Sequence, residues 1–300
     1  MPAPGRHPEE LLPLPGDVTI TDVVLRDGLQ DEPVVVAVPD RVAVAAALAA
    51  AGVRAIEAAS FVNPARVPQM AGAEELFAAL PRGGRVRYSA LALNARGVAR
   101  AVAADVDEIV LVVSAGRGHS LANAGRGTEE VLAGLRDAVA GHPGAAFTGA
   151  VSTAFTCPFD GEIPPHRLLD VARGLAGMGV TRMVLADTLG TTRPERIART
   201  LAAVRVALPD VEFGLHLHDA SGQALDTVDA ALELGVTRFD AAAGGYGGCP
   251  FAPGAHGNLA TERLVAHLHS RGVRTGIDED ALADAVSLVR KCLARGTPLT

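Results

Sequence analysis

Short runs rich in apolar and β-branched residues alternate along this chain with longer amphipathic segments rich in alanine and leucine. Such alternation is typical of parallel strands joined by helical crossovers. The runs that read as strands are residues 17–24, 53–59, 86–93, 107–114, 145–152, 182–186, 211–217 and 237–243. The segments that read as helices are residues 39–51, 73–80, 95–103, 128–140, 164–177, 194–207, 222–234, 259–271 and 279–295.

Eight strand–helix units predict an α/β fold, a closed (β/α)8 TIM barrel with an extra C-terminal helix. No low-complexity linker divides the chain, so residues 17–300 are expected to form one catalytic domain. Residues 1–16 contain proline and glutamate but no apolar run, and are expected to be a loose arm. A doubly wound sheet would need a GxGxxG-type turn after the first strand, where this chain has LRDGLQ.

Composition narrows the class of protein. The net charge is −7 without a basic stripe, which argues against a nucleic-acid partner. No apolar stretch approaches the roughly 20 residues that cross a bilayer, so no membrane segment is expected. The three cysteines are widely spaced and lack a CxxC pair, which indicates reduced thiols and a cytoplasmic protein.

Catalytic groups of this fold come from the C-terminal ends of the strands and the loops that follow them. Two histidines in a His-x-His pair point to the same side of a strand and can reach one ion. Imidazole nitrogens with carboxylate and amide oxygens suit Mg²⁺, Mn²⁺ or Zn²⁺. The unusual residues predicted to lie at these strand ends are Arg26, Asp27, Glu57, Asp187, His216, His218, Cys249 and Asn258.

Each candidate also has a purely structural interpretation. Arg26 would point away from Asp27 on an ideal strand, and enters the site only if the strand end bends. Glu57 can hold Arg26 or an imidazole in place, and Asp187 can cap a helix. The glycine-rich loop 244–262 could be a simple connection, but Cys249 within it can act as acid, base or nucleophile.

Several motifs together resemble the 3-hydroxy-3-methylglutaryl-CoA lyase family, part of a superfamily of metal-dependent barrel enzymes. They are LRDGLQDE (25–32), IEAASFVNPARVPQM (56–70), ADTLG (186–190), HLHDASGQAL (216–225) and GGCPFAPGAHGNLATE (247–262). The resemblance extends over residues 17 to 295. The segment FTGAVSTAF (147–155) departs from the family in lacking an arginine and an aromatic residue, which leaves the acyl part of the substrate open.

The resemblance implies a metal-dependent retro-Claisen cleavage of hydroxymethylglutaryl-CoA, or of a close hydroxyacyl-CoA, to acetoacetate and acetyl-CoA. It implies leucine degradation as the context, an acyl-CoA as the ligand, and Mg²⁺ or Mn²⁺ in preference to Zn²⁺. We also expect a homodimer. The implied metal ligands are Asp27, His216, His218 and Asn258, the catalytic residues Cys249, Arg26, His216, Glu57 and Asp187, and the substrate-binding residues Arg26, Gln30, Ser60 and Asn123.

Two alternatives remain open from the sequence. One is a related metal-dependent aldolase or Claisen-type acyltransferase that acts on a different 2-oxo or hydroxy acid. Relatives that catalyse the condensation usually carry an extra C-terminal region, so chain length helps to distinguish them from the lyases. The other is a barrel without activity that serves as a binding protein, which the full set of polar residues at the strand ends disfavours.

Overall fold

A computed structural model describes residues 17–248, 252 and 257–299. Its centre is a closed barrel of parallel strands in the order β1, β11, β10, β9, β6, β5, β4, β3. These strands are β1 (Thr19–Asp22), β3 (Ala55–Ser60), β4 (Arg87–Ala92), β5 (Glu108–Ser114), β6 (Phe147–Ser152), β9 (Arg182–Asp187), β10 (Glu212–Leu217) and β11 (Arg238–Ala241). Because β1 pairs with both β3 and β11, the sheet closes, which confirms the TIM barrel and excludes the doubly wound alternative.

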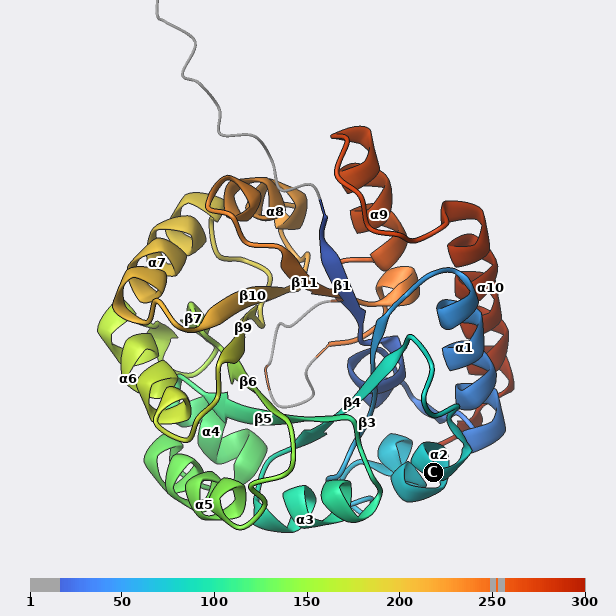
Figure 1. The fold of residues 1–300 in the computed structure, drawn as a ribbon, viewed down its shortest axis with the longest axis horizontal. Coiled ribbons are helices and arrows are strands. Elements are labelled where there is room, and N and C mark those ends of the chain that lie inside the picture. The colour runs from blue at the N-terminus through green and yellow to red at the C-terminus, as the bar shows by residue number, and fades with distance from the viewer. Residues whose placement is uncertain (1–16, 249–251, 253–256, 300) are drawn as a thin grey trace, which may run out of the picture.

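Helices surround the barrel as a ring (Figure 1). They are α1 (Val38–Ala50), α2 (Ala73–Ala79), α3 (Ala95–Ala103), α4 (Arg117–Ala124), α5 (Thr128–Ala140), α6 (Pro165–Ala176), α7 (Pro194–Ala207), α8 (Ala224–Glu233), α9 (Thr261–Ser270) and α10 (Glu279–Arg295). Each predicted helix is present, and α4 is an addition. The extra C-terminal helix α10 packs beside α1 and covers the outside of the barrel near its seam, where β1 pairs with β3 and β11.

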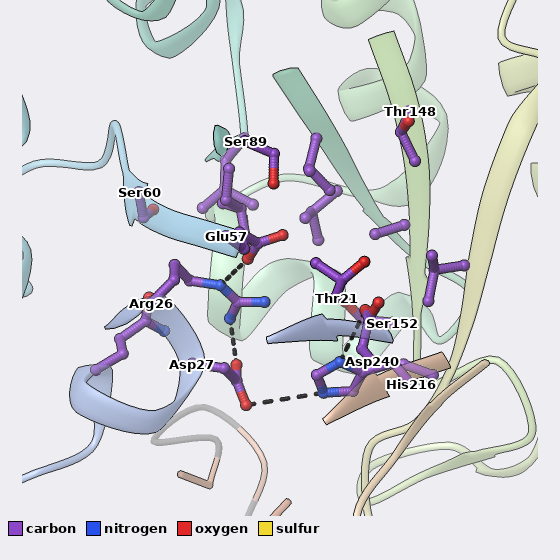
Figure 2. Close-up of a pocket in the computed structure, with 18 of the residues that line it drawn as sticks. Thr21, Arg26, Asp27, Glu57, Ser60, Ser89, Thr148, Ser152, His216 and Asp240 are labelled. Atoms are coloured by element: carbon purple, nitrogen blue, oxygen red, sulfur yellow. Dashed lines mark hydrogen bonds and ion pairs between the residues drawn. The ribbon is translucent and has the colours of Figure 1, made fainter. Parts of the chain in front are cut away.

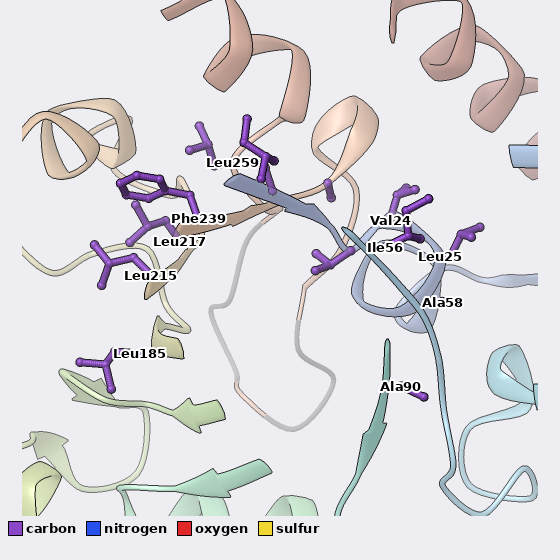
Figure 3. Close-up of a cluster of buried hydrophobic side chains, with 14 of the residues drawn as sticks. Val24, Leu25, Ile56, Ala58, Ala90, Leu185, Leu215, Leu217, Phe239 and Leu259 are labelled. Atoms are coloured by element: carbon purple, nitrogen blue, oxygen red, sulfur yellow. The ribbon is translucent and has the colours of Figure 1, made fainter. Parts of the chain in front are cut away.

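The apolar core lies between the strands and the helical ring. Outward-facing side chains such as Ile56, Leu185 and Phe239 are almost completely buried there (Figure 3). Burial of apolar surface contributes about 25 cal/mol per Å², so this continuous layer is the main source of the barrel's stability. The opposite faces of the same strands are thereby left to line the barrel's interior.

Several short elements were not expected from the sequence. The first strand ends at Asp22, and the chain continues into a π-helical turn, η1 (Val24–Gly28). Two short antiparallel ladders pair β2 (Val34–Val35) with β12 (Thr297–Pro298) and β7 (Thr156–Cys157) with β8 (Gly161–Glu162). The 3-10 helices are η2 (Pro68–Met70) and η3 (Ala243–Gly245).

In the part of the chain that the structure describes, no helix combines the length and the apolar character needed to cross a membrane. The predicted loose arm, residues 1–16, lies outside the described residues.

Candidate metal centre and substrate pocket

Arg26 and Asp27 reach the mouth of the barrel from the wide turn η1. The backbone N–H groups of both residues donate to Val23 O, at 3.1 and 2.8 Å, and this geometry winds the chain away from a strand conformation. Sequence neighbours would point to opposite sides of a strand, whereas here both side chains line one cavity. The Arg26 guanidinium forms ion pairs with Asp27 and with Glu57 of β3 (Figure 2). The turn thus supplies the bend that the sequence analysis required for Arg26.

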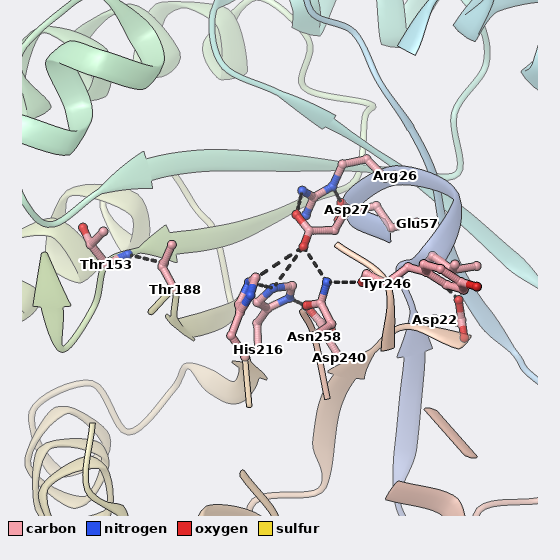
Figure 4. Close-up of polar contacts among 12 residues, drawn as sticks. Asp22, Arg26, Asp27, Glu57, Thr153, Thr188, His216, Asp240, Tyr246 and Asn258 are labelled. Carbon is pink, nitrogen blue, oxygen red and sulfur yellow. Dashed lines mark hydrogen bonds and ion pairs between the residues drawn. The ribbon is translucent and has the colours of Figure 1, made fainter. Parts of the chain in front are cut away.

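His216 and His218 face Asp27 from the end of β10. The Nε2 atoms of the two rings are 3.3 Å apart, and they lie 3.7 and 3.8 Å from Asp27 Oδ2 (Figure 4). One ligand atom from each of these buried residues lies within 4.8 Å of the others. Two imidazole nitrogens and a carboxylate oxygen at this spacing can hold a divalent cation.

Asp240 fixes the orientation of the His216 ring from the neighbouring strand. It is the register partner of His216 on β11, and its Oδ2 lies 3.2 Å from His216 Nδ1. Burial alone would lower the pKa of His216, but the hydrogen bond to Asp240 and the charge of Asp27 outweigh it and raise that pKa. A carboxylate behind a ligating imidazole is a common way of holding the ring. The sequence analysis did not select Asp240. Its position in the predicted strand that follows the one bearing His216 could have indicated it.

Asn258 approaches from the segment that returns over the strand ends. Its Nδ2 donates to Asp27 Oδ2 at 2.7 Å and to Tyr246 O at 2.9 Å (Figure 4). Gly247 permits this approach, because a Cβ there would lie 2.3 Å from Asn258 Nδ2. The predicted metal ligand is the amide oxygen, so ligation requires the planar amide to be turned over by a half-rotation.

The site carries more negative than positive groups. Burial opposes ionisation of Asp27, but Arg26 and the two histidines lower its pKa to about 2. Burial raises the pKa of Glu57, although Arg26 opposes this. Three carboxyl groups, those of Asp27, Glu57 and Asp240, therefore surround one guanidinium, and a bound cation would relieve their mutual repulsion.

A cavity of about 220 Å³ opens beside these residues, and all four predicted substrate-binding residues line it: Arg26, Gln30, Ser60 and Asn123. Asn123 comes from α4, the helix that the sequence analysis missed. Within the described residues, the buried Ser60 hydroxyl has no hydrogen-bond partner. An unpaired buried hydroxyl is costly, which makes Ser60 a ready partner for a bound polar group.

Asp187 occupies the end of β9 but engages the turn that follows it. Its carboxylate accepts hydrogen bonds from the Thr192 backbone N–H at 3.1 Å and from the Thr192 hydroxyl at 2.8 Å. Thr188, the next residue, lines the cavity. This arrangement favours the structural interpretation of Asp187 as a turn-capping residue, and its catalytic role stays a prediction.

The cysteines fall in different places. Cys249 lies outside the described residues, directly after Gly248, which lines the cavity. Cys157 and Cys292 are buried free thiols. The Cys157 thiol donates to Asp160 at 3.2 Å, and Cys292 lies in α10, so neither faces the candidate metal ligands.

Comparison with known proteins places these observations in a family. Residues 17–289 match the model of the HMGL-like family. The chain is 40% identical to (R)-citramalyl-CoA lyase of Chloroflexus aurantiacus over 94% of this chain and 92% of that protein. It is 33% identical to hydroxymethylglutaryl-CoA lyase of Bacillus subtilis, over 96% of this chain and 97% of that protein. A solved HMG-CoA lyase from Acinetobacter baumannii, in complex with coenzyme A and 3-methylmalate, superimposes with a TM-score of 0.90 at 36% identity, covering 95% of this chain and 94% of that one.

Proposed function

We propose that this chain, which belongs to the HMGL-like family and is a carbon–carbon lyase, cleaves 3-hydroxy-3-methylglutaryl-CoA or a close 3-hydroxyacyl-CoA. The products would be acetyl-CoA and a 3-oxo acid, which is acetoacetate for the methyl substrate. The observation that carries the proposal is the buried Asp27, His216 and His218 cluster beside Arg26 in one cavity. Relatives named as lyases of two different acyl-CoA esters support the reaction class more strongly than any single substrate.

The donor set fits a divalent metal held by Asp27, His216 and His218, with the Asn258 oxygen as a fourth ligand. The resemblance to the lyase family favours Mg²⁺ or Mn²⁺, although two imidazole ligands would also suit Zn²⁺. Such a cation would bind the substrate's hydroxyl and a neighbouring oxygen and lower the pKa of the hydroxyl.

The chain's own residues would then move two protons and stabilise one charge. A base, Asp27 or His216, takes the hydroxyl proton, and Asp240 keeps His216 oriented for that step. The C2–C3 bond breaks, C3 becomes a carbonyl, and the bonding electron pair stays on C2 as the enolate of acetyl-CoA. Arg26, held by Glu57, offsets the enolate charge.

Cys249 would donate a proton to C2 and so complete acetyl-CoA. The position of Cys249 in the sequence, next to the cavity-lining Gly248, supports this role. Gln30, Ser60 and Asn123 would bind polar groups of the substrate. The unpaired Ser60 hydroxyl gives the most direct support among them.

A second candidate is cleavage of (R)-citramalyl-CoA by the same steps. The 40% identity to the Chloroflexus aurantiacus enzyme favours it. A related metal-dependent aldolase or Claisen-type acyltransferase acting on another 2-oxo or hydroxy acid is a third. The context of leucine degradation, a cytoplasmic location and a homodimer remain predictions, the last of which light scattering would test.

The test is release of acetyl-CoA from hydroxymethylglutaryl-CoA and from (R)-citramalyl-CoA, with added Mg²⁺ or Mn²⁺ and with a chelator. We expect metal-dependent release from at least one ester, and a loss of about 10²- to 10⁴-fold in kcat for Cys249→Ala, the usual contribution of a proton donor. Cys292→Ala, which removes a buried thiol of α10, serves as the matched control. Undiminished release in the presence of chelator would refute the metal's role.

A further inference from the structure

An apolar wall faces the candidate metal ligands from the other side of the barrel. We define this apolar wall as Leu91 of β4, Val110 and Val112 of β5, and Ala150 of β6, which contact one another and line the cavity. In the closed strand order, β4 lies opposite β10, β5 opposite β11 and β6 opposite β1. By strand register, Val112 and Ala150 lie level with Gly214, two residues before His216, and Leu91 and Val110 lie one level deeper. A molecule bound at His216 and Asp27 therefore has the apolar wall across the lumen and below it.

The apolar wall borders open space. The inward-facing Val110 and Val112 are 8% and 6% exposed, whereas Ile109 and Leu111 on the outer face of the same strand are 1% and 0% exposed. In most TIM barrels, layers of bulky side chains fill the interior. Here the exposure of the wall indicates that, among the residues the structure describes, large side chains do not fill this part of the lumen.

Small residues leave that space. Val112, Ala150, Val184 and Gly214 are consecutive register partners across β5, β6, β9 and β10, so they share one level of the barrel. Ala150 contributes only a methyl group, whereas the space beside Gly214 is taken by Arg238, whose carbonyl oxygen would lie 2.9 Å from a Cβ there. At Ala150 this level is therefore wider than one filled by large aliphatic residues.

The lumen becomes polar at the lower edge of the apolar wall, where Thr148 is the register partner of Val110. Arg182 pairs with Glu108, and the Thr148 hydroxyl also donates to Glu108. An apolar group that entered from the site would meet these polar groups at the floor. The apolar surface thus has a limited depth, which suits a short chain better than a long fatty chain.

We propose that the substrate carries, at its carbinol carbon C3, an alkyl group longer than methyl that packs against the apolar wall. This inference rests on the proposed function and names its substrate class as 3-hydroxy-3-alkylglutaryl-CoA. The chemistry is unchanged: C2–C3 breaks, the hydroxyl proton leaves as C3 becomes a carbonyl, and C2 gains a proton. The products are acetyl-CoA and a 3-oxo acid bearing the alkyl group, and no redox partner is needed.

The experiment measures kcat/KM for a series in which the C3 group is methyl, propyl, pentyl or undecyl. An added methylene in an apolar pocket changes kcat/KM by about 10-fold or more. We expect the propyl or pentyl ester to exceed the methyl ester by at least about 10-fold. The undecyl ester should fall below them, because its chain would reach the floor at Arg182 and Glu108.

Two variants of the apolar wall test its part in that preference. Ala150→Leu fills the wide level, and Val112→Thr keeps the shape of the side chain but adds a hydroxyl. Each should lower the propyl-to-methyl ratio of kcat/KM by about 10-fold. Ala46→Leu on the exposed side of α1 is the matched control and should leave the ratio unchanged. If Ala150→Leu does not fold, Val112→Thr alone decides.

The outcomes separate this inference from the proposed function. Cleavage of the methyl ester with slower cleavage of every longer homologue overturns the inference and leaves the proposed function standing. An unchanged ratio in the wall variants also overturns it. Release of acetyl-CoA from no ester of the series overturns both.

Discussion

One hydrogen bond, from His216 Nδ1 to Asp240, holds a candidate metal ligand in place. Removing such a partner typically lowers metal affinity by about 10- to 100-fold. We therefore expect Asp240→Ala to weaken Mn²⁺ binding by this factor in a calorimetric titration. Asp229→Ala, which removes a similar contact at 2.8 Å from His267 on the helical ring, should bind Mn²⁺ like the native protein. Equal affinities for all three proteins would contradict the positioning role.

His119 should make stability depend on pH. It is buried, its Nδ1 lies 2.8 Å from the Ser114 hydroxyl, and burial lowers its pKa from 6.5 to about 4. The unfolded chain binds the proton more readily, so this contribution to stability is complete above about pH 6.5 and is lost as pH falls toward about 4. The loss amounts to about 3 kcal/mol.

Urea unfolding of the native protein and of His119→Gln across this pH range would measure the effect. The variant should lack this part of the pH dependence, whereas His166→Gln at an exposed histidine should retain it. A pH dependence in His119→Gln that matched the native curve would show that other groups cause it.

The turn after β9 supports His218 through a glycine. Gly190 has φ +65°, and a Cβ there would lie 2.6 Å from the backbone C and O atoms of His218. Gly179 also has a positive φ, +87°, but a Cβ there would meet nothing within 4 Å. A comparison of substitutions at the two positions therefore distinguishes the effect of backbone strain from the effect of steric contact with a candidate ligand.

We expect Gly179→Ala to cost about 1–2 kcal/mol of unfolding free energy and to keep its activity. Gly190→Ala should cost more and should also lose metal-dependent activity, because His218 must move. Measurement of unfolding and of acetyl-CoA release on the same preparations would test this. Equal behaviour of the two variants would speak against a specific contact with His218.

The larger elements were predictable because each carries a long periodic signal. The strands and helices of the barrel lie within a few residues of their predicted bounds. Asp27, Glu57, His216 and His218, which were selected because catalytic groups of this fold come from strand ends, all line one cavity. The predicted first strand ran too far, to residue 24. Apolar Val23 and Val24 continue the pattern of a strand, yet they are buried by the turn into η1.

What the sequence did not reveal has physical reasons. The segment RGHSLANA of α4 is short, polar and interrupted by glycine, so its helical period is weak. Asp240 lies beside His216 only because of the register in which β10 and β11 pair, and that register depends on the folded structure. The apolar wall was equally invisible, because an inward-facing valine and a core valine look the same in sequence.

At the scale of the whole molecule, Asp22 joins distant parts of the chain where the barrel closes. Its carboxylate accepts hydrogen bonds from the backbone of Val24 at 2.9 Å and of Ala243 at 3.0 Å, and from the Thr261 hydroxyl at 2.7 Å. Burial raises the pKa of this carboxyl group to about 7. Without this carboxylate, the three donors, which come from η1, η3 and α9, would lose their hydrogen-bond acceptor.

Asp22→Ala should therefore lower the free energy of unfolding by about 3 kcal/mol, since an unsatisfied buried donor costs about 1–3 kcal/mol. Chemical denaturation would measure it. Asp17→Ala, which removes an exposed ion pair to Arg274 near the same seam, should leave the denaturation midpoint unchanged. A similar midpoint for Asp22→Ala would mean that the seam closes without this carboxylate.

The wide turn η1 has a consequence for how the length of this loop can vary. Successive residues of a helical turn point in different directions around its axis, so deletion or insertion of one residue between Val23 and Asp27 would carry the carboxylate out of the cavity. The barrel behind it would be untouched, because β1 already ends at Asp22. A change of loop length at η1 is thus one step by which a descendant of this protein would lose the candidate metal site while keeping its fold.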